Sequence, residues 1–139
     1  MRIANDTKYD FSDVLIVPKR STLESRSDVP LERTFNLYHS NMTINRVPVI
    51  AANMDNIGTF NMGKALNQHK MMTALGKHYS EEALINFFKS IDAVNSGIFY
   101  SMGITDKDIE KFENVRKQVY IPYVNIDVAN GYTERFIKF

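Results

Sequence analysis

The stretch Met71-Met-Thr-Ala-Leu-Gly-Lys-His-Tyr-Ser-Glu-Glu-Ala-Leu-Ile-Asn-Phe-Phe-Lys-Ser-Ile91 decides the fold, because it joins a strand pattern to a helix pattern in one short unit. Residues 71–75 are a largely apolar, β-rich run of the length of a buried strand. From residue 80 onward the apolar side chains recur at helical spacing and share one face, namely Leu84, Phe87, Phe88 and Ile91. Ser80 suits the N-cap, and the two glutamates after it favour a helix N-terminus. We therefore predict a strand followed by a helix.

The same pattern recurs on both sides of this unit. Apolar, β-rich runs lie at residues 47–54, 97–104 and 120–128. Helical spacing is found at residues 58–69, and again from Thr105, which has Asp108 three residues later as an approximate capping box. Residues 132–139 begin a further helix. Strands that alternate with helices predict right-handed βαβ units and a parallel sheet.

Four such units are half of an eight-stranded barrel, whose usual length is about 250 residues. We therefore predict an α/β fold, the N-terminal half of a (β/α)₈ TIM barrel of about four βα units. A short β-rich segment precedes it, with extended pieces at residues 13–17 and 34–44. The predicted domain is 1–139, single and incomplete, with 1–46 as an N-terminal cap segment and 47–139 as the first barrel units. The pattern leaves open a self-contained, flavodoxin-like sheet of four strands.

Composition excludes several kinds of chemistry. The 139 residues contain no cysteine, which rules out a disulfide, a thiolate metal site and a thiol nucleophile within this chain. The net charge of +1 gives no reason to expect a nucleic-acid or membrane-surface partner. No run approaches the ~20 apolar residues of a membrane span, and no secretory signal is evident, so we expect a cytoplasmic protein. The three histidines lack metal-ligand spacing, and no metal is expected.

Polar residues follow each predicted strand, where parallel α/β sheets bind their ligands. They are Asn53 and Asp55, Lys77 and His78, Thr105 and Asp106, and Asp127 and Asn130. A lysine and an aspartate placed in this way form an ion pair that positions a substrate or holds a proton. The alternative is that these side chains only cap helices and tie loops.

The loop Ser25-Arg26-Ser27 offers a guanidinium beside two hydroxyls, with Lys19 and Arg20 before it. Such a group binds phosphate bidentately, although a solvated basic loop has the same composition. No glycine-rich phosphate loop of either common dinucleotide type is present in the sequence. A nicotinamide cofactor therefore would not bind as it does in a Rossmann domain.

Several segments in the same order resemble GMP reductase, within the IMP dehydrogenase/GMP reductase family. They are Asp13-Val-Leu-Ile-Val-Pro-Lys-Arg-Ser-Thr22, Ser25-Arg-Ser27, Val47-Pro-Val-Ile-Ala-Ala-Asn-Met-Asp55, Lys77-His-Tyr-Ser80 and Asp127-Val-Ala-Asn-Gly-Tyr132. The resemblance covers essentially the whole chain and corresponds to the N-terminal portion of that family. Asn53 favours the reductase over the dehydrogenases, which usually have another residue there.

The resemblance implies an NADPH-dependent oxidoreductase of purine salvage that converts GMP to IMP, ammonia and NADP⁺. In the family a cysteine adds to purine C2, ammonia leaves, and hydride from NADPH then reaches C2. Ser25, Arg26, Lys77 and the turn Asp127, Val128 and Ala129 match NADPH contacts, and Lys77 and Asp127 also match the catalytic proton network. Met54 matches a residue that lies against the purine. Family enzymes are homotetramers.

Two local departures from the family pattern fall near this site. Gly76 stands where the family commonly has histidine before the active-site lysine, and Ile104 stands where a hydroxyl is expected unless Thr105 supplies it. The cysteine loop and the GMP phosphate site are also absent from the sequence, which ends inside a predicted helix. We therefore expect a chain inactive alone that a C-terminal half-barrel polypeptide completes. The alternative is a non-catalytic nucleotide-binding or interaction module of a reductase homo-oligomer.

Overall fold

The computed structural model describes residues 3–139 and divides the chain into two units, residues 1–30 and 31–139. The first unit contains two short 3₁₀ turns, η1 (Phe11–Asp13) and η2 (Arg26–Asp28), and each is closed by a capping box. Residues 14–17 belong to no strand, so the extended piece predicted at 13–17 takes part in no sheet. The single domain with a cap at 1–46 stays a prediction.

A β-hairpin opens the second unit. Strands β1 (Arg33–Asn36) and β2 (Thr43–Arg46) pair antiparallel, with Phe35 opposite Ile44. The prediction of one extended piece over residues 34–44 is therefore wrong, because a turn separates two strands. Asn41 has a φ of 54° in this turn, a left-handed conformation that asparagine adopts more readily than most residues.

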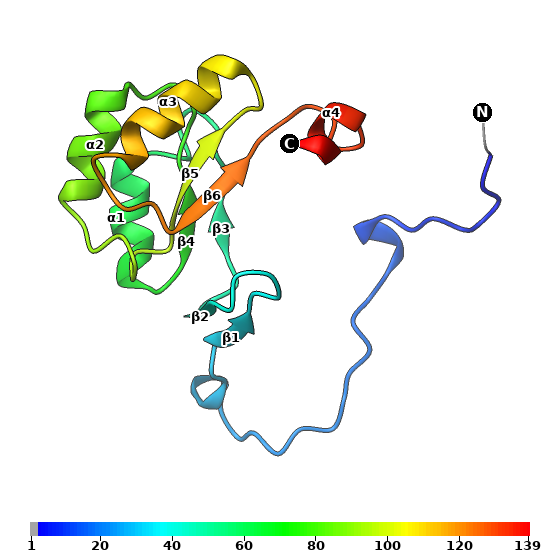
Figure 1. Ribbon diagram of the computed structural model, residues 1–139. Coiled ribbons are helices and arrows are strands. Elements are labelled where there is room, and N and C mark those ends of the chain that lie inside the picture. The colour runs from blue at the N-terminus through cyan, green and yellow to red at the C-terminus, as the bar shows by residue number, and fades with distance from the viewer. Residues whose placement is uncertain (1–2) are drawn as a thin grey trace. The chain divides into compact units, whose positions relative to one another are not determined.

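The rest of the second unit is a parallel sheet with its helices (Figure 1). The strands are β3 (Ile50–Ala51), β4 (Met72–Ala74), β5 (Ile98–Met102) and β6 (Tyr123–Ile126), and they lie in the order β3-β4-β5-β6. The helices are α1 (Phe60–Gln68), α2 (Glu81–Lys89), α3 (Asp106–Arg116) and α4 (Glu134–Lys138). Every predicted strand and helix of residues 47–139 is present, with shorter bounds.

The two faces of the sheet carry different contacts because side chains alternate along a strand. On one face Ile98, Tyr100 and Met102 of β5 pack with apolar residues of α2 and α3, namely Leu84, Ile85, Phe87, Phe88 and Val115. On the other face the hairpin residue Ile44 packs with Met72 and Tyr123, and Phe99 lies against them. The hairpin thus packs against the start of this face, at the first residues of β4 and β6.

This arrangement decides between the two predicted folds. A flavodoxin-like sheet changes direction after its second strand, so that its strand order runs 2-1-3-4. Here each strand pairs with the next one in sequence, and the packed helices share one face with the core. The chain is the N-terminal half of a (β/α)₈ barrel. In residues 3–139 no helix combines the length and apolar character that a membrane crossing requires.

Thr73 in β4 supplies a first prediction. Its side chain is fully buried, and its Oγ1 has no hydrogen-bond partner in the described part of the chain. An unsatisfied buried hydroxyl costs roughly 1–3 kcal/mol, so Thr73→Val is expected to raise the free energy of unfolding by about 1 kcal/mol. Urea denaturation measures the change.

Thr105→Val is the matched control, because the Thr105 hydroxyl caps α3 and accepts from the Asp108 amide at 3.2 Å. Loss of such a cap costs about 1 kcal/mol, so the same substitution is expected to destabilise here. A loss of stability in Thr73→Val would mean that its hydroxyl is satisfied.

Candidate functional site

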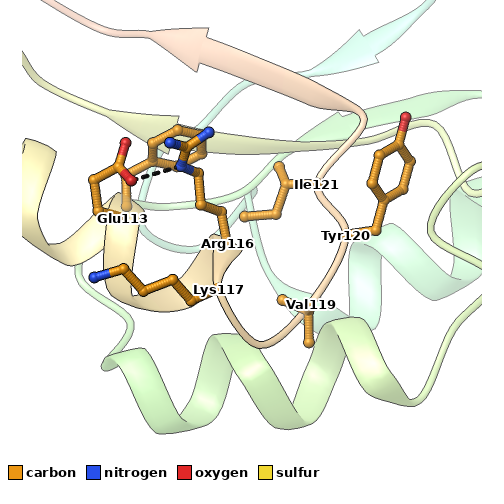
Figure 2. A pocket seen from close by; sticks show the side chains of 7 residues that line it. Glu113, Arg116, Lys117, Val119, Tyr120 and Ile121 are labelled. Carbon is orange, nitrogen blue, oxygen red and sulfur yellow. Dashed lines mark hydrogen bonds and ion pairs between the residues drawn. The ribbon is translucent and has the colours of Figure 1, made fainter.

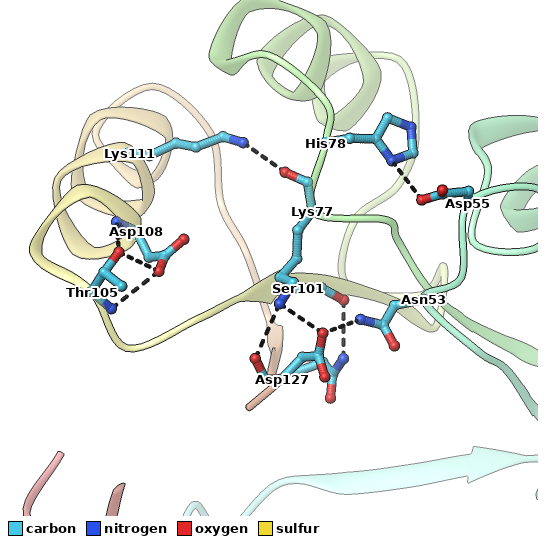
Figure 3. Close-up of polar contacts among 10 residues, drawn as sticks. Asn53, Asp55, Lys77, His78, Ser101, Thr105, Asp108, Lys111 and Asp127 are labelled. Atoms are coloured by element: carbon cyan, nitrogen blue, oxygen red, sulfur yellow. Dashed lines mark hydrogen bonds and ion pairs between the residues drawn. The ribbon is translucent and has the colours of Figure 1, made fainter. Parts of the chain in front are cut away.

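Three polar side chains meet where strands β3, β4 and β6 end (Figure 3). Asp127 directly follows β6, Lys77 lies in the loop after β4, and Asn53 lies in the loop after β3. The Lys77 ammonium lies 2.9 Å from Asp127 Oδ2 and also donates to the Asp127 carbonyl at 3.2 Å. Asn53 Nδ2 donates to the same carboxylate oxygen at 2.9 Å. The predicted ion pair is present at the carboxyl edge of the sheet.

Backbone contacts hold the two loops of this site together. The amides of Ile57 and Gly58 donate to the Met54 carbonyl at 2.9 and 2.8 Å, which closes the loop after β3 into a tight turn. The Gly76 amide then donates to the Gly58 carbonyl at 2.8 Å. The turn that carries Asn53 is thereby fastened to the residue before Lys77. Asp127 itself is fixed by its amide, which donates to the Met102 carbonyl at 2.8 Å.

The electrostatics of the site favour a charged Asp127. The hydrogen bond from Lys77, followed by that from Asn53, lowers the pKa of the Asp127 carboxyl below its ordinary value. The pair remains open to water, with 44% of the Lys77 side chain and 38% of the Asp127 side chain exposed. A fixed carboxylate beside an accessible ammonium can bind a polar ligand and can relay a proton to it.

The lowered pKa of Asp127 predicts acid sensitivity. A carboxyl whose folded pKa lies below its unfolded one contributes stability that is present above the unfolded pKa and is lost as pH falls through the folded one. Because the pair is more than one third exposed, the contribution is expected to be below about 1 kcal/mol. Asp127→Asn should therefore flatten the dependence of the unfolding free energy on pH between about 5 and 2.

Glu110→Gln on the exposed face of α3 is the control for this titration. It removes a carboxylate without touching the Lys77–Asp127 pair. An equal flattening in both variants would assign the acid sensitivity to overall charge.

The other predicted binding residues differ in their exposure and in the unit of the chain to which they belong. Met54 is 62% exposed in the loop beside Asn53. Val128 is half-buried and Ala129 exposed, directly after Asp127. Ser25 and Arg26 lie in the other unit, where Ser25 caps η2. Their predicted contacts with NADPH stay predictions.

Sequence reasoning noted Asn53 at a strand end but did not include it among the binding residues. It also missed the hydrogen bond from Asn125 Nδ2 to Ser101 Oγ at 3.0 Å, between residues that lie opposite each other in β5 and β6. Two polar residues within apolar strands were the available signal. Next to the Ile104 departure, the Thr105 hydroxyl is engaged with the Asp108 carboxylate in the cap of α3.

A pocket lies at the opposite end of the sheet (Figure 2). It is formed by the end of α3 and the segment before β6, and its lining is Phe112, Glu113, Arg116, Lys117, Val119, Tyr120 and Ile121. Within it Arg116 Nε and Glu113 Oε2 form an ion pair at 2.7 Å. It is remote from Asp127, which follows the other end of β6. Among residues 3–139 no three acidic or histidine side chains are grouped to hold a metal ion.

Comparison with known proteins finds similar sequences and a similar solved structure. No protein-family model matches the chain. It is 50% identical over its whole length to a GMP reductase of Klebsiella pneumoniae subsp. pneumoniae, 49% identical to one of Salmonella typhi and 48% to one of Escherichia coli O1:K1. The chain spans 41% of the length of each of these relatives.

Among solved structures the fold is similar to inosine 5′-monophosphate dehydrogenase from Legionella pneumophila, with a TM-score of 0.73 and 31% sequence identity. The match covers 92% of this chain and 38% of that one.

Proposed function

We propose that this chain supplies one half of a GMP reductase site. The premise is that the chain belongs to the IMP dehydrogenase/GMP reductase family and matches the N-terminal portion of a GMP reductase. In the complete reaction GMP and NADPH give IMP, ammonia and NADP⁺, as a step of purine nucleotide salvage. The proposed setting is cytoplasmic and the proposed assembly a homotetramer.

The observation that carries this proposal is the Lys77–Asp127 pair, held at the carboxyl edge of the sheet in a chain that is 50% identical to a GMP reductase. In the proposal Lys77 and Asp127 hold the proton network beside the reacting centre. Ser25, Arg26, Lys77, Asp127, Val128 and Ala129 contact NADPH, and Met54 lies against the purine.

The chain alone is proposed to be inactive, because the family's reaction begins with a cysteine thiolate and this sequence has no cysteine. Purine and hydride donor cannot react through such a covalent intermediate without a thiol from outside these 139 residues. In the proposal, a C-terminal half-barrel polypeptide supplies the thiol and is called the complement below.

Co-expression tests the proposal. The chain is produced together with the part of the Klebsiella pneumoniae GMP reductase that it does not match, and GMP-dependent oxidation of NADPH is followed at 340 nm. Activity is expected only when both polypeptides are present. The control is the same pair in which the complement's cysteines are replaced by alanine. Absence of activity in a folded, co-purifying pair would contradict the proposal.

A second candidate is a non-catalytic nucleotide-binding module, favoured by the formation of the Lys77–Asp127–Asn53 cluster within this chain. Titration of NADPH against the purified chain distinguishes it. Saturable binding without turnover after co-expression would support the module, and no binding up to millimolar NADPH would remove it.

A further inference from the structure

Lys77 has a long and flexible side chain, so its position over Asp127 depends on the backbone that carries it. That backbone is held by Lys111 of α3 (Figure 3). The Lys111 ammonium donates to the Lys77 carbonyl at 3.1 Å and to the Tyr79 carbonyl at 2.5 Å. One half-buried cation therefore holds the loop after β4 at the residues on both sides of His78. It comes from α3, the second helix after this loop in the chain.

A second contact from the same helix lies one turn further on. Asn114 Nδ2 donates to Glu81 Oε1 at 3.4 Å, at the first residue of α2. Helix α3 thus holds both the loop after β4 and the start of the helix that follows. The loop is fixed from two directions, by Lys111 on this side and by the Gly76–Gly58 hydrogen bond on the other.

The helix dipole does not account for the placement of Lys111. Ser80 is the N-cap of α2, and the N-terminal end of a helix disfavours a nearby cation. The two carbonyls that accept from Lys111 belong to residues just before this cap. Lys111 is held by these two carbonyls, and its hydrogen bonds order the backbone of residues 77–79.

We propose that Lys111 is a positioning residue, which fixes the backbone of residues 77–79 and so holds the Lys77 ammonium on the Asp127 carboxylate. Its importance for NADPH binding rests on the proposed function, whereas its effect on the Lys77–Asp127 pair does not. Lys111 acts through Lys77 and does not itself touch Asp127.

The test compares three variants of the chain. Lys111→Met removes both hydrogen bonds, Lys111→Arg keeps the charge and the donors, and Lys107→Met removes an equal charge from the exposed face of α3. The first readout is the titration of the Asp127 carboxyl by carbon-13 NMR, and thermal melting shows that each variant is folded. The Lys77 ammonium is the neighbouring charge that lowers the pKa of Asp127, and it also contributes to the lowered pKa of Asp108.

Lys111→Met is expected to raise the pKa of Asp127 toward its ordinary value, because the fixed Lys77 donor is lost. Lys111→Arg is expected to restore the low value, and Lys107→Met to leave it unchanged. A folded Lys111→Met whose Asp127 titrates as in the unchanged chain would overturn the proposal, as would an equal rise in Lys107→Met. If Lys111→Met does not fold, Lys111→Leu, which also removes both hydrogen bonds, takes its place with the same criteria.

The second readout is NADPH affinity, expected to fall about tenfold in Lys111→Met, as for the loss of one charge-assisted contact. Failure of the unchanged chain to bind NADPH would count against the nucleotide-binding module. The titration of Asp127 would still decide the role of Lys111.

Discussion

Gly58→Ala is expected to lower the free energy of unfolding by about 3 kcal/mol, at the upper end of the cost of overfilling a packed site. A Cβ at this residue would collide with the Ala74 carbonyl oxygen and would lie 2.9 Å from both Asn53 Cα and the Gly76 amide nitrogen. All three are backbone atoms, which cannot rotate away. The added methyl group must therefore separate the loops after β3 and β4.

The same separation breaks the hydrogen bond from Gly76 to Gly58, and with it the register between Asn53 and Lys77. Equilibrium denaturation in urea measures the loss. Gly131→Ala is the matched control, since its Cβ would meet nothing closer than 3.6 Å, an ordinary contact with the Phe136 ring. Equal costs in the two variants would contradict the close-packing argument.

In the co-expressed enzyme, Lys77→Met and Asp127→Asn are each expected to reduce the turnover of GMP-dependent NADPH oxidation by about 10²-fold or more, the usual contribution of a positioned acid or base. The reason is the 2.9 Å pair, in which each partner holds the other in its charged form. Because the two act as a unit, the double variant should lose little more than either single one.

Steady-state kinetics on matched preparations tests this expectation. Lys89→Met, an exposed position in the last turn of α2, is the control that loses one charge outside the site. Additive losses in the double variant would mean that Lys77 and Asp127 act separately. A turnover unchanged in all variants would remove both residues from the proposed catalytic network.

The strands and helices from residue 47 onward were predictable because their apolar periodicity is strong and their caps are local. Ser80 and Thr105 are N-caps of α2 and α3, as their sequence context indicated. The shortness of β3 was not predictable in the same way. Residues 52–54 fall within the predicted strand, but their backbone leaves the sheet and leads into the turn fastened to Gly76. That turn depends on a contact between loops far apart in sequence.

The candidate site was likewise predictable only in part. Lys77 and Asp127 were expected to pair because the ends of parallel strands meet at one edge, and position along each strand suffices for that inference. Asn53 as the second donor to Asp127, and Lys111 as a donor to the loop of Lys77, depend on side-chain direction across neighbouring elements. A single sequence does not reveal those directions.

The sequential order of the parallel strands also bears on how the chain folds. Each strand from β3 to β6 pairs only with strands next to it in the chain, so its partner is close in sequence when the pair forms. Closing a shorter stretch of chain costs less conformational entropy than closing a longer one. During synthesis, each new βα unit can therefore dock on the one that left the ribosome before it, and the sheet can grow from its N-terminal edge at the pace of translation.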